Sequence, residues 1–160
     1  MSGAEPEAPA LSTHANALLL GERGVLLRGV SGAGKSALTY ELIARARLRG
    51  VFTRLIGDDR VMLVNCNGRL IARPHPLAAG RIELRGLGLA SEPFEPAGVI
   101  RCVVDLAPPG EPPLRYPADA DARTQLCGLS LPRCFAELRD PAAAEKILFF
   151  CIGLEQFWRI

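Results

Sequence analysis

The stretch G-V-S-G-A-G-K-S occupies residues 29–36 and follows the pattern G-x-x-x-x-G-K-[ST]. Glycine allows backbone dihedral angles that other side chains forbid, so successive N–H groups of such a loop can point at one anion. Lys35 is expected to reach the β- and γ-phosphates of a nucleotide, and the Ser36 hydroxyl is expected to ligate Mg²⁺. The predicted nucleotide-binding loop comprises Gly29, Val30, Ser31, Gly32, Ala33, Gly34, Lys35 and Ser36.

The residues on either side of this loop have the patterns of a strand and a helix. Residues 24–28 are a short apolar run. After the loop, Leu38, Leu42 and Ala46 recur at helical spacing, and Gly50 stands where a helix commonly ends. Strand, glycine-rich loop and helix in this order are the context that a phosphate-binding loop requires. The sequence therefore predicts an α/β domain of the P-loop nucleotide-binding class.

The chain has 160 residues, of which 49% are hydrophobic and 22% are charged, as is typical of one soluble domain. Residues 1–10 are rich in Pro, Ala and Glu, so we expect a flexible start followed by a single domain over residues 11–160. The net charge is +2, and no run of Lys or Arg suggests a nucleic-acid partner.

The five cysteines are scattered and form no C-x-x-C pair, which argues against a zinc site and against a disulfide framework. The chain does not open with a basic segment followed by an apolar run. The most apolar stretch, residues 147–154, is too short to span a bilayer. We therefore expect reduced thiols, no membrane contact and a cytoplasmic location.

Several stretches have strand and turn signals. Asn67-Gly68 is a strong two-residue hairpin turn. The expected strands, in chain order, are residues 17–20, 25–28, 51–56, 60–64, 69–73 and 99–106.

The remaining stretches are less regular. Residues 81–89 mix charge with glycine and are expected to be neither an ordinary strand nor a helix, and the prolines within residues 107–121 predict a loop. A final helix is expected from Pro141 to Ile160, apolar on almost every side. A helix of that kind is typically buried or lies in an interface.

Carboxylates follow two of the apolar runs. Asp58-Asp59 come after Leu55-Ile56, and Asp105 comes after Val103-Val104. Magnesium at a phosphate-binding loop usually has a further carboxylate near it, at the end of a neighbouring strand. A kinase also needs a group that accepts the proton of the substrate hydroxyl, for which Asp58 is the first candidate and Asp59 the second. Because no N-K-x-D stretch is present to read guanine, ATP is the expected nucleotide.

Four features in this order resemble the catalytic domain of HPr kinase/phosphorylase. They are His14, fifteen residues before Gly29; the phosphate-binding loop itself; the pair Asp58-Asp59; and Glu83-Leu84-Arg85-Gly86-Leu87-Gly88, which has the form E-[IL]-R-G-x-G. The last is the most specific. The resemblance covers about residues 14–133 and implies a mixed central sheet flanked by helices, as in the phosphoenolpyruvate carboxykinase-like fold.

The resemblance also implies roles for individual residues. Lys35 would hold the phosphates, and Ser36 and Glu83 would bind Mg²⁺. Asp58 would be the general base when a serine of the phosphocarrier protein HPr is phosphorylated, and the general acid in the reverse phosphorolysis. The other site residues implied are His14, Asp59, Arg85 and Arg123.

The sequence also departs from the family pattern. We expect a short bacterial form without the family's N-terminal domain, and Ala37 stands where an acidic residue often follows the loop serine. The stretch linked to phosphorolysis is reduced to Leu129-Ser130-Leu131-Pro132-Arg133, which favours kinase activity over the reverse reaction.

Two other functions fit a phosphate-binding loop. One is a small P-loop kinase that acts on a metabolite, which would need a lid with paired Arg residues after Asp105. The other is a nucleotide-binding regulatory module without transferase activity, favoured if Asp58 points away from the loop.

The final helix and the resemblance together predict a homo-oligomer, a hexamer by resemblance. In this interpretation, truncation after Pro141 would abolish assembly or HPr phosphorylation while ATP binding persists.

Overall fold

A computed structural model describes residues 9–108 and 110–157, with residues 154–157 described by their backbone alone. Most of the expected flexible start, residues 1–8, lies outside the described residues. The first half of the chain contains β1 (Leu11–Thr13), β2 (Ala15–Leu20), β3 (Arg23–Arg28), α1 (Lys35–Leu48), β4 (Thr53–Gly57), β5 (Val61–Cys66) and β6 (Arg69–Pro74). The second half contains β7 (Arg81–Leu84), β8 (Gly88–Ser91), β9 (Gly98–Leu106), the 3₁₀ turn η1 (Asp119–Ala122), β10 (Arg123–Leu126), β11 (Leu129–Ala136) and α2 (Ala143–Phe157).

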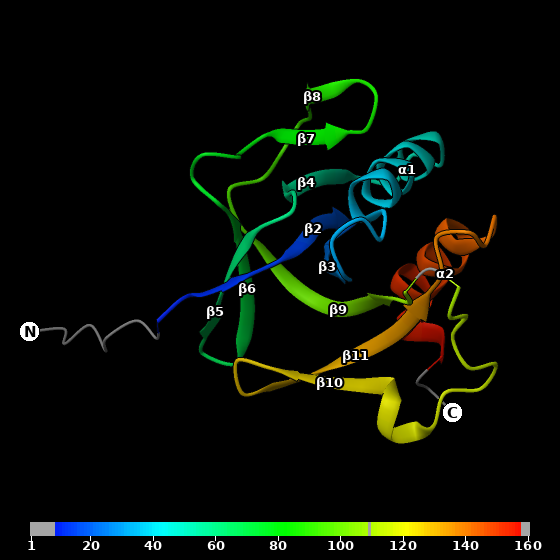
Figure 1. Ribbon diagram of the computed structural model, residues 1–160. Coiled ribbons are helices and arrows are strands. Elements are labelled where there is room, and N and C mark those ends of the chain that lie inside the picture. The colour runs from blue at the N-terminus through cyan, green and yellow to red at the C-terminus, as the bar shows by residue number, and fades with distance from the viewer. Residues whose placement is uncertain (1–8, 109, 158–160) are drawn as a thin grey trace, which may run out of the picture.

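Within the described part of the chain, most strands join one mixed sheet in the order β1-β5-β6-β9-β3-β2-β4. The strand before the phosphate-binding loop, β3, lies between β2, to which it is antiparallel, and β9, to which it is parallel. The hairpin β10–β11 joins this sheet through the parallel pairing of β11 with β9. The hairpin β7–β8 is a separate small sheet that stands beyond β4 and close to α1 (Figure 1).

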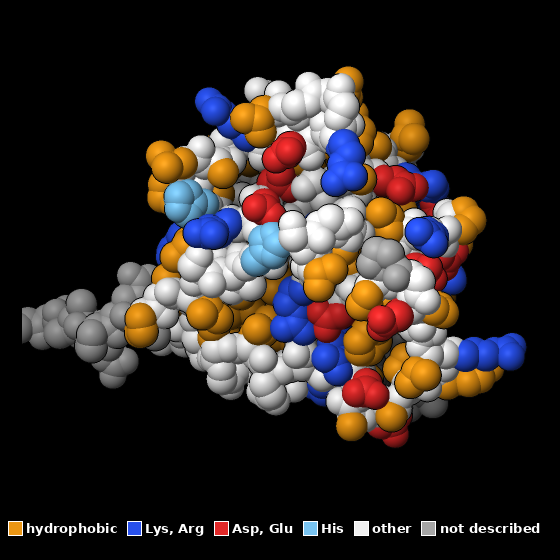
Figure 2. Space-filling view, in the orientation of Figure 1, with side chains coloured by type: hydrophobic (Ala, Val, Ile, Leu, Met, Phe, Trp, Pro, Cys, Tyr) orange, Lys and Arg blue, Asp and Glu red, His pale blue; other side chains and the backbone are white. Residues whose placement is uncertain are grey.

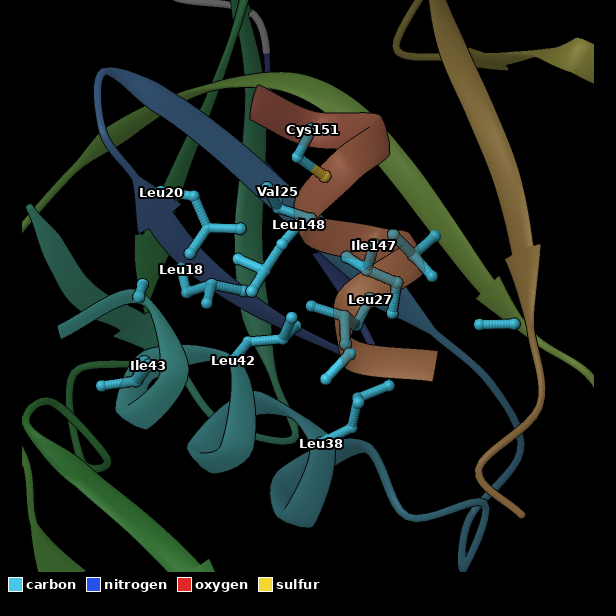
Figure 3. Close-up of a cluster of buried hydrophobic side chains, with 14 of the residues drawn as sticks. Leu18, Leu20, Val25, Leu27, Leu38, Leu42, Ile43, Ile147, Leu148 and Cys151 are labelled. Carbon is cyan, nitrogen blue, oxygen red and sulfur yellow. The ribbon is translucent and has the colours of Figure 1, made fainter. Parts of the chain in front are cut away.

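Both helices pack on the same face of the sheet (Figure 1). Alternate residues of each strand point to opposite faces, so Leu27 of β3 packs against the helices while Leu26 packs in a second core. In Figure 3 the first core is drawn with Leu38, Leu42 and Ile43 of α1 and Ile147, Leu148 and Cys151 of α2 around Leu18, Leu20, Val25 and Leu27. The second core is formed by strand residues alone, because β5, β6 and β11 cover that face of the curved sheet.

The predicted α/β P-loop class with a mixed sheet is confirmed, with both helices on one face of it. The tight turn between β2 and β3 and the Asn67-Gly68 turn between β5 and β6 lie where the sequence predicts them. Asn67 and Gly68 have φ angles of 50° and 80°, as a turn of this type requires.

Two sequence-based expectations for the second half of the chain were wrong or incomplete. Residues 81–91 form an ordinary antiparallel hairpin, with Ile82 opposite Ala90. The glycines interrupt the apolar alternation but supply the turn, where Gly86 and Gly88 have positive φ angles of 87° and 86°. The hairpin β10–β11 was not predicted, because its half-buried strands have too little apolar alternation to be recognised.

The final helix begins at Ala143, two residues after Pro141, and Asp140 Oδ1 accepts a hydrogen bond from the N–H of Ala142 just before it. Ile147 and Leu148 belong to the core, whereas the Phe149 side chain is exposed. The side chains of residues 154–157 and all of residues 158–160 lie outside the described residues, including Phe157 and Trp158. The described part of the helix completes the core and also presents Phe149 to solvent.

All five cysteines are free, as expected. Burial raises the pKa of the Cys134 thiol to about 12, so this thiol stays protonated and unreactive near neutral pH. In the described part of the chain, neither helix is long and apolar enough to cross a membrane.

Candidate active site

The phosphate-binding loop connects the end of β3 to the start of α1, as the sequence predicts. Gly32 and Gly34 have φ angles of 78° and 90°, which an L side chain would disfavour. The Lys35 side chain is buried, and its ammonium group donates hydrogen bonds to the carbonyl oxygens of Gly29 (3.0 Å) and Val30 (3.3 Å). The loop is thereby folded around its own lysine, with the positive end of α1 directly behind it.

Asp58 lies directly after β4 and is only 7% exposed. Its Oδ1 atom accepts hydrogen bonds from Ser36 Oγ and Asn16 Nδ2, both at 2.6 Å. Its Oδ2 atom accepts a hydrogen bond from the backbone N–H of Glu83 at 2.9 Å. Asp58 therefore faces the phosphate-binding loop, and its two oxygens also join that loop to β2 and to the β7–β8 hairpin.

Asp59 has a different environment, although it is the next residue. Its φ angle of 62° is in the left-handed region, and its side chain is 71% exposed. The carboxylate lies 2.5 Å from His14 Nε2, and the backbone N–H donates to Asn16 Oδ1 at 2.8 Å. The structure thus brings His14 to the acidic pair by way of Asp59, on the solvent side.

Asn16 is a site residue that the sequence analysis missed. It is fully buried in β2. Its side chain forms hydrogen bonds with the Asp58 carboxylate, the backbone N–H of Asp59 and the Thr39 hydroxyl. A signal was available, because an amide at this position interrupts the apolar run of residues 15–20, two residues after His14.

Two clefts meet at the acidic pair, each with a volume of about 430 Å³. Both include Asp58, Asp59 and Glu83 in their walls. The first cleft is completed by the phosphate-binding loop with Arg85 and Leu138, and its walls are Ser31, Gly32, Gly34, Lys35, Ser36, Ala37, Asp58, Asp59, Glu83, Arg85 and Leu138. The second cleft has basic and apolar walls: Arg60, His75, Leu77, Ala78, Arg81 and Leu89. Figure 2 shows acidic and histidine side chains gathered on the face below the β7–β8 hairpin.

This arrangement can be compared with known proteins. The family model described as "HPr Serine kinase C-terminal domain" matches residues 7–91, which is more than half of the chain. The chain belongs to this family. The matched segment contains His14, the phosphate-binding loop, the acidic pair and the β7–β8 hairpin.

Individual relatives of the family agree with this match. An HPr kinase/phosphorylase of Mycoplasma mycoides subsp. mycoides is 40% identical over 81 residues, which are 51% of this chain and 24% of the relative. One of Clostridium beijerinckii is 36% identical over 86 residues, which are 54% of this chain and 26% of the relative. The matched part thus spans about a quarter of the length of these curated relatives.

A solved structure titled "Structure of the Hpr(Ser) kinase/phosphatase from Coxiella burnetii" matches with a TM-score of 0.73 and 24% identity. The match covers 91% of this chain and 98% of that one. At this level of identity the likeness shows that the two chains share a fold. The mixed α/β architecture is therefore that of the HPr kinase family.

One site residue implied by the family resemblance is not placed at the clefts. Arg123 is the first residue of β10, and its guanidinium group donates hydrogen bonds to the Ser130 hydroxyl (2.8 Å) and carbonyl (2.9 Å) on β11. It lies outside the stretch that the family model matches and lines neither cleft. The unpredicted β10–β11 hairpin holds Arg123 against Ser130, and a role for Arg123 in the active site stays a prediction of the resemblance.

Asp105, the other carboxylate that follows an apolar run, is paired with arginine residues outside the clefts. It lies opposite Arg28 in the pairing of β9 with β3, and Arg28 Nε and Nη2 donate to its two oxygens at 2.7 and 2.8 Å. Arg133 of β11 adds a weaker contact at 3.5 Å. Two guanidinium groups therefore neutralise Asp105, and it does not line the phosphate cleft.

Proposed function

We propose that this domain is an ATP-dependent protein serine kinase that phosphorylates the phosphocarrier protein HPr in the cytoplasm and so regulates the phosphotransferase system. One observation supports this most strongly: two clefts, one built on a phosphate-binding loop, share the walls Asp58, Asp59 and Glu83. A donor and an acceptor bound in the two clefts would meet at these carboxylates. The names of the relatives supply the acceptor, because they are HPr kinases.

The first cleft is suited to the phosphates of ATP. Glycine-rich backbone and the start of α1, whose first turn has no acidic residue, favour an anion there. Lys35 would exchange its loop carbonyl partners for phosphate oxygens. Arg85 lies in the wall of the same cleft, and we propose that it stabilises charge on the transferring phosphoryl group.

Magnesium fits the donor set of this cleft. Ser36 Oγ and Asp58 Oδ1 are hard oxygen ligands 2.6 Å apart, and Glu83 lies in the same wall. No group of three acidic, histidine or cysteine side chains in the described part of the chain lies around one point. A Mg²⁺ ion bound here would take its other ligands from water and phosphate. When bound with ATP, Mg²⁺ would neutralise charge on the phosphates. We propose Ser36, Asp58 and Glu83 as its protein contacts.

For the proton of the acceptor hydroxyl, the geometry favours Asp59 over Asp58, which reverses the order expected from sequence. Asp58 is nearly buried, and both of its oxygens already accept hydrogen bonds. Asp59 is exposed where the clefts meet, and His14 beside it can share the proton that Asp59 takes up. We therefore propose Asp59 with His14 as the proton acceptor and Asp58 as the group that holds Ser36.

The second cleft is suited to a polypeptide acceptor rather than a small metabolite. Leu77 and Leu89, which are 85% and 67% exposed, stand in its walls beside Arg60 and Arg81. Exposed leucines beside arginines favour an apolar protein surface with acidic neighbours. We propose that HPr docks here with its acceptor serine at Asp59.

The two other functions find less support. Asp58 faces the phosphate-binding loop, which argues against a binding module without transferase activity. The described residues between β9 and η1 form no helix that would make a metabolite-kinase lid. Arg133, in the stretch linked to phosphorolysis, donates to the Asp121 carbonyl and contacts Asp105. We therefore propose that transfer to serine predominates over the reverse reaction.

The experiment that tests the proposal is incubation of the protein with γ-labelled ATP, Mg²⁺ and purified HPr. We expect acid-stable and hydroxylamine-stable label on one serine of HPr, located by mass spectrometry. HPr with that serine replaced by alanine is the acceptor control, and Lys35→Ala and Ser36→Ala are the enzyme controls. The proposal fails if the wild-type protein binds ATP but labels no protein serine, or if both variants keep the wild-type rate.

A further inference from the structure

We propose that Asn16 is a positioning residue that directs the two adjacent carboxylates to opposite sides of the site, Asp58 toward the phosphate-binding loop and Asp59 toward His14. This inference rests on the proposed function and deepens it, because it explains how neighbouring residues of one type could take different roles.

The orientation of the Asn16 amide follows from its partners. The Thr39 hydroxyl donates its hydrogen to the carbonyl oxygen of Lys35 at 2.7 Å, so toward Asn16 it can act only as an acceptor. A carboxylate can only accept, and a backbone N–H can only donate. Asn16 Nδ2 must therefore face Thr39 (3.0 Å) and Asp58 (2.6 Å), and Oδ1 must face the N–H of Asp59 (2.8 Å).

The nitrogen and the oxygen of this amide hold two consecutive residues, Asp58 by its side chain and Asp59 by its backbone. Nδ2 holds the carboxylate of Asp58 in a position where it also accepts from Ser36. Oδ1 holds the N–H of Asp59, whose φ angle of 62° is disfavoured for a residue with a side chain. This backbone conformation directs the Asp59 side chain away from the loop and toward His14, 2.5 Å away.

Packing of the core alone does not require a polar residue at position 16. Asn16 is fully buried next to Ala15 and Ala17, so an apolar side chain could fill the space. Such a side chain would leave Asp58 Oδ1 with one partner fewer and the Asp59 N–H without its side-chain acceptor. The backbone could then return to an ordinary φ angle, and the Asp59–His14 contact would be lost.

The test compares Asn16→Ala with Asn65→Ala. Asn65 is a matched control: its amide also accepts from a backbone N–H, that of Gly68 (3.0 Å), and donates to a partner distant in sequence, the carbonyl of Cys127 (3.0 Å). It lines neither cleft. Both variants should lower the melting temperature. Only Asn16→Ala should lower kcat for HPr, by roughly 10²-fold or more, which lies within the range for loss of acid–base catalysis. The Kd for a fluorescent ATP analogue should stay within about threefold.

A second measurement does not depend on activity. The chain has two histidines, so imidazole NMR signals of His14 can be read with His75 as an internal reference. In Asn16→Ala the His14 signals should move toward those of Asp59→Asn, while His75 signals stay. In Asn65→Ala neither should move.

The inference is overturned if Asn16→Ala loses stability but keeps both wild-type kcat and wild-type His14 signals. An inactive wild-type protein would instead overturn the proposed function, and the His14 signals would still decide whether Asn16 positions Asp59.

Discussion

The side chain of Leu138 lies directly against Gly34 of the phosphate-binding loop: a Cβ atom on Gly34 would lie 2.0 Å from Leu138 Cδ2. Gly34 also has a φ angle of 90°. The segment before α2 therefore packs on the start of α1 at the one loop position where an added side chain would both displace Leu138 and require a disfavoured backbone conformation.

We expect Gly34→Ala to weaken ATP binding at least tenfold and to lower the melting temperature. The left-handed conformation costs an L residue about 1–2 kcal/mol, and Leu138 must also move. Gly128→Ala is the control, because its φ angle of 76° gives similar strain while nothing lies within 4 Å of the added carbon. Calorimetric titration with ATP would measure the affinities. Equal affinity in Gly34→Ala and wild type would show that the loop tolerates another backbone conformation.

Asp58→Asn and Asp59→Asn should have different effects. Asp59→Asn removes the proposed proton acceptor and should lower kcat by about 10²–10⁴-fold with little change in ATP affinity. Unlike Asp59→Asn, Asp58→Asn should also raise the magnesium concentration needed for half-maximal rate. An amide is a poorer magnesium ligand than a carboxylate, and the change disturbs the hydrogen bond with Ser36. Steady-state kinetics at several magnesium concentrations would distinguish them. If Asp58→Asn alone lowered kcat, with an unchanged magnesium requirement, the order expected from sequence would be restored.

Glu83→Gln should raise the magnesium midpoint while leaving the fold intact, because the backbone N–H of residue 83, not its side chain, donates to Asp58. Glu111→Gln, an exposed change in the loop after β9, is the control. A magnesium titration of the initial rate is the measurement. An unshifted midpoint would remove Glu83 from the proposed metal contacts.

Glu145 should make stability depend on pH in the acid range. Hydrogen bonds from Arg49 and Arg45 of α1 lower the pKa of this α2 carboxyl. Because the folded-state pKa lies below the unfolded one, the contribution is present above about pH 4.3, the ordinary value, and is lost as pH falls through the folded pKa. The melting temperatures of wild type and Glu145→Gln should therefore differ near neutral pH and converge in acid. A constant difference over this range would show that the ion pairs do not link the helices.

The outer face of α2 is expected to lie in a homo-oligomer interface. Phe149 and Ile152 are 64% and 45% exposed there. Light scattering should show an assembly for wild type, a hexamer by the resemblance, and a smaller mass for Phe149→Asp, with Leu114→Asp in the exposed loop after β9 as control. A wild-type monomer with full activity on HPr would contradict this. Truncation after Pro141 is not a suitable test, because it would remove Ile147 and Leu148 from the core and should unfold the domain rather than spare ATP binding.

The local features of the site could be read from the sequence alone. The phosphate-binding loop, the helix after it and the Asn67-Gly68 turn depend on backbone conformations that neighbouring residues dictate, so their patterns were sufficient. Asp58-Asp59 was recognised as a site because adjacent carboxylates after an apolar run are conspicuous in a sequence.

The different environments of Asp58 and Asp59 depended on the tertiary structure. Asn16 contacts Asp58 and the Asp59 backbone across 42 and 43 residues of sequence, and His14 reaches Asp59 across 45. The contacts of Arg123 could not be predicted for a related reason, since a hairpin of weak apolar pattern holds it against Ser130. Hydrogen bonds between distant segments form only when the sheet pairs β2 with β4 and the separate β7–β8 hairpin packs beside them. Local sequence patterns therefore located the site, while sheet packing determined which carboxylate faces the loop and which faces solvent.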